Sequence, residues 1–303
     1  MKIDINFGPE QSPITRGKIE EMITPGRRRR MKLSLEWPEL LHPPREEGKD
    51  WSLVLPFCET LRNAFHSMCS AGHIGLREGK EERCYTFFNY LEENSIDFEH
   101  IEECLEIIGA YVAIRDCLAL SFAIDYDREG GNPEAPQTRV GQLRSQAKPY
   151  GREATEQTRR SADVLADECL AALKKLTCYD SATCIVAMPP SNPDKPFDLP
   201  KYLAAHISEK LEKPDKSEKV RTVKARPGNK EVPCEEKLPN IEGTVAVDGE
   251  AFKGEIVLLI DDLYQSGVSM NYVAMLLLEA GARKIFGFSC EKTCSNDDNV
   301  SRR

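Results

Sequence analysis

One stretch of the chain decides the fold: Ile256-Val257-Leu258-Leu259-Ile260-Asp261-Asp262-Leu263-Tyr264-Gln265-Ser266-Gly267-Val268-Ser269. Its first five residues are branched and apolar, which is typical of a strand buried on both faces of a parallel sheet. Two carboxylates follow, then a short turn, and then an amphipathic helix expected from about Ser269 to Ala280. The order predicts one strand–turn–helix unit of an α/β sheet.

The turn in this stretch suits a phosphate group. N–H groups at a helix N-terminus are unpaired, and the helix dipole adds positive potential there. Ser266 and Ser269 can donate hydroxyls, and Gly267 lets a ligand approach the backbone. The carboxylates of Asp261 and Asp262 suit vicinal hydroxyls, directly or through a divalent cation. An ordinary turn could also carry Asp-Asp, but together these residues favour a site for a phosphorylated sugar.

The second half of the chain alternates apolar runs with helical patterns. We expect helices over 153–176, 199–211 and 269–280, and strands over 184–188, 219–224, 243–247, 256–260 and 284–290. Such alternation predicts the α/β class, with a mostly parallel sheet flanked by helices.

The first half of the chain has a different texture. Residues 1–50 are rich in proline, which predicts an irregular and partly flexible segment, and Arg27 to Arg30 form a basic run. Apolar residues at three- and four-residue steps predict a helical region over 51–124, with helices that include 81–91 and 98–122. Residues 125–150 are expected to be a linker or long loop, 151–295 the sheet domain, and 296–303 a flexible tail.

Composition limits the partners and the location of the protein. The 303 residues are 40% hydrophobic, which argues against a disordered chain, and the formal net charge is −9. That charge makes nucleic acid an unexpected partner, although a local cationic site is compatible with it. No apolar run reaches the roughly 18 residues of a membrane span, and the first residues lack a signal peptide's apolar core. We therefore expect a cytoplasmic protein.

Eleven cysteines are scattered along the chain without a C-x-x-C pair. Several lie in apolar runs, which predicts buried thiols in a reducing compartment, and Cys290 and Cys294 are interpreted in this way. A zinc-binding helix face would use four residues spaced along one helix, and an ordinary structural helix is the favoured interpretation of the same spacing. The four residues are Cys58, His66, Cys69 and His73.

The central stretch also resembles a known family. A strand, Asp-Asp, three residues and Ser-Gly-x-Ser form the signature of type I phosphoribosyltransferases, and Asp261 to Ser269 fit it closely. The flanking segments resemble the ComF-like amidophosphoribosyltransferase branch in their order, from the stretch around Lys148 to the residues 221–230. The resemblance covers roughly residues 139–294. It departs from the branch in lacking a zinc ribbon, and Gln265 and Ser269 replace residues more usual there.

The resemblance implies a phosphoribosyltransferase that acts with Mg²⁺ on 5-phosphoribosyl 1-pyrophosphate and an unidentified nitrogen nucleophile. It implies that two carboxylates hold the ribose hydroxyls and the Mg²⁺, and that the turn binds the terminal phosphate. It also implies that a proline-containing loop, the proline loop, faces the pyrophosphate, and that cations of a mobile hood neutralise the pyrophosphate. In that order the residues are Asp261 and Asp262; Gln265, Ser266, Gly267, Val268 and Ser269; Pro189, Pro190 and Ser191; Lys224, Arg226 and Lys230.

Two alternatives stay open from the sequence. A regulator on the same fold could sense phosphoribosyl pyrophosphate or a nucleotide without catalysis, and the basic residues of the hood favour the enzyme over it. The role of residues 1–124 has no assignment, so a homodimer or a protein partner bound through the N-terminal helical region is also open.

Overall fold

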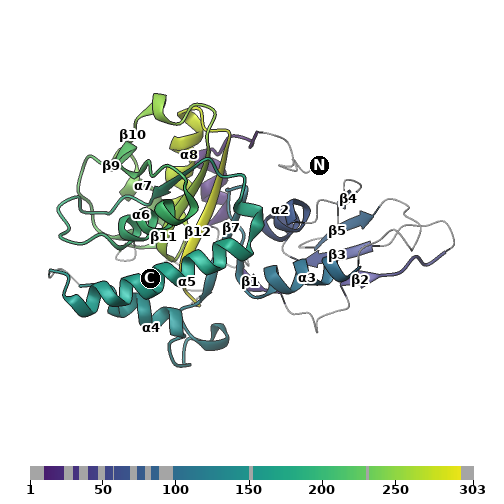
Figure 1. Cartoon of the computed structure of the whole chain (residues 1–303). Coiled ribbons are helices and arrows are strands. Elements are labelled where there is room, and N and C mark those ends of the chain that lie inside the picture. The colour runs from purple at the N-terminus through teal and green to yellow at the C-terminus, as the bar shows by residue number, and fades with distance from the viewer. Residues whose placement is uncertain are drawn as a thin grey trace.

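A six-stranded sheet organises the computed structural model, with the strand order β1-β6-β7-β12-β11-β8 (Figure 1). The structure describes residues 10–23, 30–33, 40–46, 52–56, 58–68, 74–78, 83–88, 98–149, 153–229 and 232–294. Four neighbouring strands run parallel: β7 (Leu120–Tyr126), β12 (Lys284–Lys292), β11 (Ile256–Tyr264) and β8 (Cys184–Ala187). Beyond β7, β6 (Val112–Ile114) pairs antiparallel with β7, and β1 (Arg30–Lys32) pairs antiparallel with β6. The predicted α/β class with a mostly parallel sheet is confirmed.

Helices cover both faces of this sheet because alternate residues of each strand point to opposite sides. In β11, Leu258 and Ile260 join one buried cluster, while Val257 and Leu259 join the other. The first cluster takes side chains from α2 (Cys58–Met68), α3 (Phe98–Gly109), α5 (Glu156–Lys175) and α6 (Leu199–Leu211). The second takes side chains from α1 (Arg16–Met22), α7 (Lys237–Ile241) and α8 (Val268–Glu279). The apolar run of β11 is therefore buried on both sides, as predicted.

The prediction of a helical region over 51–124 is wrong in part. Three strands of a second, four-stranded antiparallel sheet lie there, and the order of that sheet is β2-β3-β5-β4. Its strands are β2 (Leu41–His42), β3 (Ser52–Pro56), β5 (Arg83–Phe88) and β4 (Ile74–Glu78). Helix α2 lies between this sheet and the main one (Figure 1). Within the expected helix over 81–91, residues 83–88 thus form a strand, because a short run rich in aromatic and β-branched residues suits a pleated surface better than a helix.

The prediction of a linker over 125–150 is also corrected. Strand β7 continues through Tyr126, and α4 (Arg139–Gln146) packs against α5, β7 and β12. The Gly- and Pro-containing connection from about residue 127 to 138 is a loop with one 3₁₀ turn, η2 (Glu129–Gly131), and residues 147–149 after α4 are irregular as well. The helix expected over 98–122 ends at Gly109, and β6 and β7 follow it in the main sheet. The main sheet therefore takes strands from both sides of residue 151.

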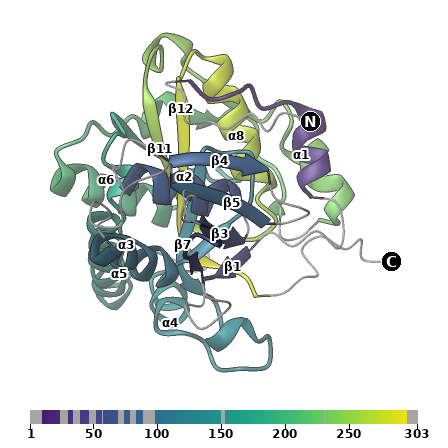
Figure 2. The same ribbon diagram turned by 90° about the vertical axis from the view of Figure 1, so that its right-hand side faces the viewer.

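Part of the segment expected to be irregular is held tightly against the main domain. Thr15 caps α1 through its Oγ1, and Figure 2 shows α1 beside α8. The side-chain oxygen of Gln11 accepts a hydrogen bond from the Ile285 N–H at 2.9 Å, and its amide donates to the Cys117 carbonyl at 2.8 Å. The basic residues Arg27 to Arg29 and the predicted tail at 296–303 lie outside the described residues.

The remaining secondary structure completes the surroundings of the main sheet. Strands β9 (Val220–Thr222) and β10 (Val245–Val247) form a separate antiparallel pair beside it. The predicted helix over 199–211 is confirmed with the same bounds, and the helix over 269–280 with a shift of one residue. Among the helices of the described residues, none is long and apolar enough to cross a membrane.

Candidate functional site

A cleft of about 830 Å³ lies at the carboxyl ends of β8 and β11. Open α/β sheets bind ligands at this edge because the connections that follow neighbouring strands diverge there. The cleft brings together most of the predicted site residues, from three separate parts of the sequence. Those that line it are Pro189, Pro190, Ser191, Arg226, Asp261, Asp262, Gln265, Ser266, Gly267 and Ser269.

Two of the described site residues do not contribute side chains to the cleft. Val268 is fully buried in the core below α8, so only its backbone can take part in the turn. Lys224 is exposed and does not line the cleft. Lys230 lies outside the described residues. Of the predicted hood cations, the structure therefore places Arg226 at the cleft.

The turn at the start of α8 requires glycine at position 267. Gly267 has a φ of 79°, in the left-handed region that glycine adopts without cost. A Cβ atom added there would lie 2.0 Å from the hydroxyl oxygen of Tyr264. Because Tyr264 is itself buried, it has little room to move aside. The close approach of backbone and ring fixes the shape of the turn.

Buried hydrogen bonds hold this turn from below. The Tyr264 hydroxyl donates to a carboxylate oxygen of Asp116 at 3.1 Å. The side-chain amide of Asn271 donates to the Gly267 carbonyl at 2.8 Å, and its oxygen accepts from the Cys117 N–H at 2.7 Å. These contacts join the turn to the connection between β6 and β7. The turn is therefore rigid before any ligand arrives, which lowers the entropic cost of binding.

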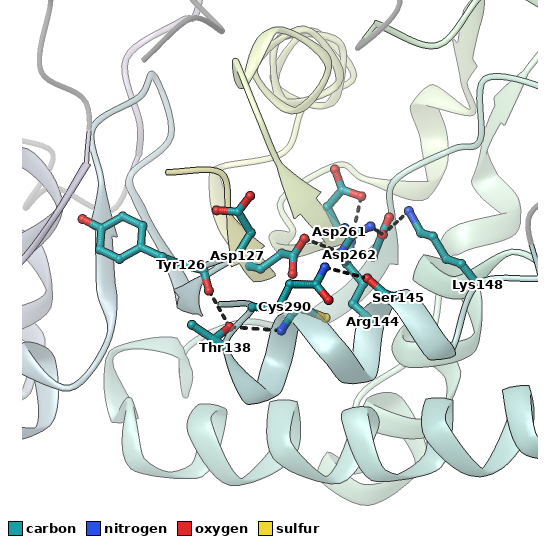
Figure 3. A network of polar contacts seen from close by, with 12 residues as sticks. Tyr126, Asp127, Thr138, Arg144, Ser145, Lys148, Asp261, Asp262 and Cys290 are labelled. Carbon is teal, nitrogen blue, oxygen red and sulfur yellow. Dashed lines mark hydrogen bonds and ion pairs between the residues drawn. The ribbon is translucent and has the colours of Figure 1, made fainter. Parts of the chain in front are cut away.

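The two adjacent carboxylates have different surroundings, although both lie within β11 rather than after it. Asp262 forms ion pairs with Lys148 and, at 3.4 Å, with Arg144 (Figure 3). Arg144 also pairs with Glu291, whose side chain is fully buried. Asp261 accepts a hydrogen bond from the Asp262 N–H at 2.8 Å. The result is a chain of alternating charges from Lys148 through Asp262 and Arg144 to Glu291.

These surroundings separate the pKa values of the two aspartates. Burial, together with the charge of Asp262, raises the pKa of the Asp261 carboxyl to about 8. Burial also opposes ionisation of Asp262, but the charges of Lys148 and Arg144 outweigh it and lower the pKa of Asp262 below its usual value. At neutral pH the pair therefore carries close to one negative charge. A divalent cation beside Asp261 would favour its ionised form as well.

The oxygen donors of the cleft fit a magnesium ion that arrives with a phosphorylated substrate. Mg²⁺ is usually held by one or two protein carboxylates together with substrate phosphates and waters. Asp261 and Asp262 provide two such carboxylates at the cleft. Within the part of the chain that the structure describes, no group of three or more His, Cys, Asp and Glu could hold a metal ion by itself. The donor set thus suits a shared ion better than a closed protein cage.

The zinc-binding helix face, the less favoured interpretation of the sequence, lies partly outside the described residues. Helix α2 contains Cys58 and His66 and ends at Met68, while Cys69 and His73 lie outside the described residues. Burial lowers the pKa of His66, as expected for a histidine at the edge of a core.

The segment predicted as a hood packs against the turn that begins α8. The Asn229 side-chain amide donates to the Ser269 hydroxyl at 2.8 Å, and Asn240 donates to the Asn229 oxygen at 2.7 Å. The Arg226 N–H donates to the Ser191 carbonyl at 3.1 Å, and its Nε donates to the Thr244 hydroxyl at 3.1 Å. Residues 226–229 therefore form one wall of the cleft, between the proline loop and the turn.

Sequence reasoning assigned no role to several residues of the cleft. Arg144 lies in α4 and Lys148 two residues beyond its end, and both reach Asp262; two basic residues only four positions apart were a signal that could have indicated them. Asn229 gave no such signal. Asp198 lines the cleft at the start of α6, and burial raises the pKa of its carboxyl to about 6 against the opposing charge of Lys195.

Comparisons with known proteins do not identify the chain. No protein-family model matches it, and no curated protein matches it either. The chemistry of the cleft is therefore the basis for assigning a function.

Proposed function

We propose that the protein binds 5-phosphoribosyl 1-pyrophosphate with Mg²⁺ and transfers the phosphoribosyl group to a nitrogen nucleophile, with release of pyrophosphate. One observation carries the proposal: a single cleft holds the carboxylates of β11, the turn before α8 and the proline loop after β8. A phosphate, a pair of hydroxyls and a second anionic group of one ligand would each find a complementary surface there.

The turn supports binding of the terminal phosphate. Backbone N–H groups at the N-terminus of α8 and the dipole of that helix favour an anion. Ser266 and Ser269 add hydroxyl groups, and Gly267 permits close approach of the phosphate to the backbone. The neighbouring carboxylates of Asp261 and Asp262 suit the ribose hydroxyls, which donate hydrogen bonds. Mg²⁺, when bound with the substrate, would neutralise part of the pyrophosphate charge.

Cations of the cleft support stabilisation of the leaving pyrophosphate. Negative charge grows on that group as its bond to the sugar breaks, so a positive side chain beside it lowers the barrier. Arg226, Lys195, Lys148 and Arg144 line the cleft. Their local charge makes an anionic substrate compatible with a chain whose formal net charge is −9.

A second candidate function is a non-catalytic sensor of phosphoribosyl pyrophosphate or a nucleotide on the same site. Two observations favour it: Lys224 does not line the cleft, and Ser269 already accepts a hydrogen bond from Asn229. A sensor needs the phosphate site and a cleft wall that changes its contacts when a ligand binds, but it does not need the cations that stabilise a leaving group. Binding alone would not distinguish the two functions, whereas turnover would.

Calorimetry with phosphoribosyl pyrophosphate tests the site. We expect wild-type protein to bind it in the presence of Mg²⁺ and more weakly in the presence of EDTA. Asp262→Asn should weaken binding about tenfold or more, since it removes the charged acceptor proposed for the ribose hydroxyls. Gly267→Trp should abolish binding, since Gly267 permits the close approach of the phosphate to the backbone. Asp248→Asn is the control, because Asp248 is exposed and lies outside the cleft. Thermal melts establish that each variant is folded.

The outcomes separate the functions. Wild-type protein that shows no binding would refute the site. Binding that is followed by pyrophosphate release with at least one member of a panel of nucleobases and amines supports the enzyme. Binding without release across the panel supports the sensor.

A further inference from the structure

A buried carboxylate of β12 is joined to the cleft through one of the residues that line it. Glu291 lies in the strand between β7 and β11, and its side chain is fully buried. Burial raises the pKa of this carboxyl to about 7, although the charge of Arg144 opposes the rise. A buried charge is costly unless it is paired. Among the described residues the cation that pairs with Glu291 is Arg144, which lines the cleft.

The close packing of α4 brings Arg144 to this carboxylate. Gly141 lies in the first turn of α4, and a Cβ atom added there would lie 2.6 Å from the Asp127 carbonyl oxygen and 3.3 Å from Oε2 of Glu291. Glycine therefore lets the helix lie directly against the end of β12. Arg144 follows three residues later, on the same face of the helix. The helix thus presents a guanidinium to Glu291 because position 141 has no side chain.

Arg144 contacts two carboxylates with two different nitrogens. Its Nε pairs with Oε1 of Glu291, and its Nη1 pairs with Oδ2 of Asp262 at 3.4 Å (Figure 3). A guanidinium is planar and carries its N–H groups in a fixed fork, so a contact that holds one nitrogen also sets the direction of the others. Lys148 pairs with the same oxygen of Asp262, but its side chain is 29% exposed against 14% for Arg144. Arg144 is therefore the more firmly held of the two cations.

We propose that Glu291 is a positioning residue for Asp262 and that it acts through Arg144. The Glu291 carboxylate holds the guanidinium at Nε, and the guanidinium holds the Asp262 carboxylate in the orientation in which it meets a ligand in the cleft. This inference deepens the proposed function, on which it rests for the identity of the ligand. The coupling between the two carboxylates does not depend on that function.

The sign of a stability coupling tests the arrangement without any ligand. Glu291→Gln, Asp262→Asn and the double variant form a cycle, measured by urea denaturation at about pH 8.5, where Glu291 is ionised. Two negative charges that only repel each other, or that compete for Arg144, give an unfavourable coupling. If Glu291 holds Arg144 in place for Asp262, the coupling is favourable, and we expect it to change the unfolding equilibrium constant by about fivefold or more.

Variants of the two cations provide the controls. In an Arg144→Met background the coupling should fall below about twofold, the usual scatter for independent sites. Arg144→Gln is measured beside Arg144→Met, so that the result does not depend on the folding of one variant. In a Lys148→Met background the coupling should persist, because Lys148 pairs with Asp262 and not with Glu291.

Calorimetry with phosphoribosyl pyrophosphate and Mg²⁺ tests whether the positioning serves the cleft. Glu291→Gln should weaken binding about fivefold or more when Arg144 is present, and less than about twofold in the Arg144→Met background. A carboxylate that only stabilised the fold would affect both backgrounds alike.

The two measurements separate this inference from the proposed function. A stability coupling that is unfavourable, that is below about twofold, or that persists without Arg144 refutes the positioning. Wild-type protein that binds phosphoribosyl pyrophosphate and binds it as tightly after Glu291→Gln also refutes it. If the wild type does not bind phosphoribosyl pyrophosphate but the coupling is favourable and depends on Arg144, the proposed function fails and the positioning of Asp262 stands.

Discussion

Replacing Gly267 with alanine tests whether the turn before α8 is as tightly constrained as its geometry indicates. The new methyl group would lie 2.0 Å from the Tyr264 hydroxyl, far inside the contact distance, and the backbone φ is 79°. Gly254 provides a matched control, because its φ is 78° and no atom lies within 4 Å of its added Cβ. Both variants carry the cost of a left-handed alanine, but only Gly267→Ala must displace a buried ring.

The expected magnitudes follow from these two contributions. A left-handed conformation costs an L-residue about 1–2 kcal/mol, so Gly254→Ala should lower the free energy of unfolding by about 1 kcal/mol. Gly267→Ala adds the overpacking of Tyr264, about 1–3 kcal/mol. Moving that ring also weakens its 3.1 Å hydrogen bond to Asp116, and an unsatisfied buried hydroxyl costs about 1–3 kcal/mol. We therefore expect Gly267→Ala to cost about 3 kcal/mol more than the control.

Urea denaturation followed by far-ultraviolet circular dichroism measures this difference. The two variants should have similar denaturant slopes and different midpoints, because the surface exposed on unfolding is the same. A difference of less than about 0.5 kcal/mol between them, within the scatter of unperturbed sites, would refute the reasoning. It would mean that Tyr264 moves aside freely and that the turn is not rigid.

Three further predictions concern charge and burial. The pKa values of three carboxyl groups are raised in the folded protein, to about 7 for Glu291, 6 for Asp198 and 8 for Asp261. The stability that these groups contribute is complete below their unfolded pKa values near 4 and is lost as the pH rises through the raised pKa values, so the free energy of unfolding should fall from pH 5 to pH 8. Glu291→Gln should reduce that fall by about 2–3 kcal/mol, measured by urea titration at each pH. Lys148→Met should lower the free energy of unfolding by about 2 kcal/mol, because it leaves Asp262 with Arg144 as its one ion-pair partner among the described residues. Lys201→Met breaks an exposed ion pair with Glu218 and should lower the free energy of unfolding by less than about 0.5 kcal/mol. Equal losses in the two variants would contradict the assigned role of Lys148. Cys178 and Cys290 should resist alkylation in the folded protein, since burial raises their pKa values, and should react after unfolding; peptide mapping that finds either one labelled as fast as the less buried Cys117 would contradict their burial.

The sequence predicted the elements whose signals are local and strong. The helix over 199–211 was found because its apolar residues recur at helical spacing. The strand from Ile256 was found because it begins with five consecutive apolar residues. Strand β11 nevertheless runs on to Tyr264, since Leu263 and Tyr264 pair with Glu291 and Lys292 of β12. No local signal contains that pairing, because it depends on a partner that lies far along the chain.

The second sheet was missed for the same physical reason. Residues 83–88 hold an apolar run that fits a short helix or a strand, and its pairing with β3 and β4 decides between them. The connection from residue 127 to 138 is rich in turn-forming residues, as linkers are, although it only joins β7 to α4. Composition thus indicated loops correctly but did not distinguish a loop within a domain from a boundary between domains.

The candidate site was predictable to the extent that its residues are contiguous. Asp261 to Ser269 form one stretch, and the structure brings Pro189 to Ser191 and Arg226 to the same cleft. Arg144, Lys148 and Asp198 reach the cleft through the packing of α4 and α6 on the sheet, which the sequence does not show. Lys224 was expected at the cleft because it lies near the hood in the sequence, but sequence position does not determine the direction of a side chain.

The position of β12 has a consequence for the way the protein is made. This strand, the last described one along the chain, lies in the middle of the sheet, between β7 and β11. During synthesis, β7 must therefore wait for its central neighbour until residues 127–283 have been added. The apolar side chains of β7 and β11 are uncovered for that time, and such surfaces favour aggregation and chaperone binding. We expect the nascent chain to acquire protease resistance late and in one step, when β12 leaves the ribosome.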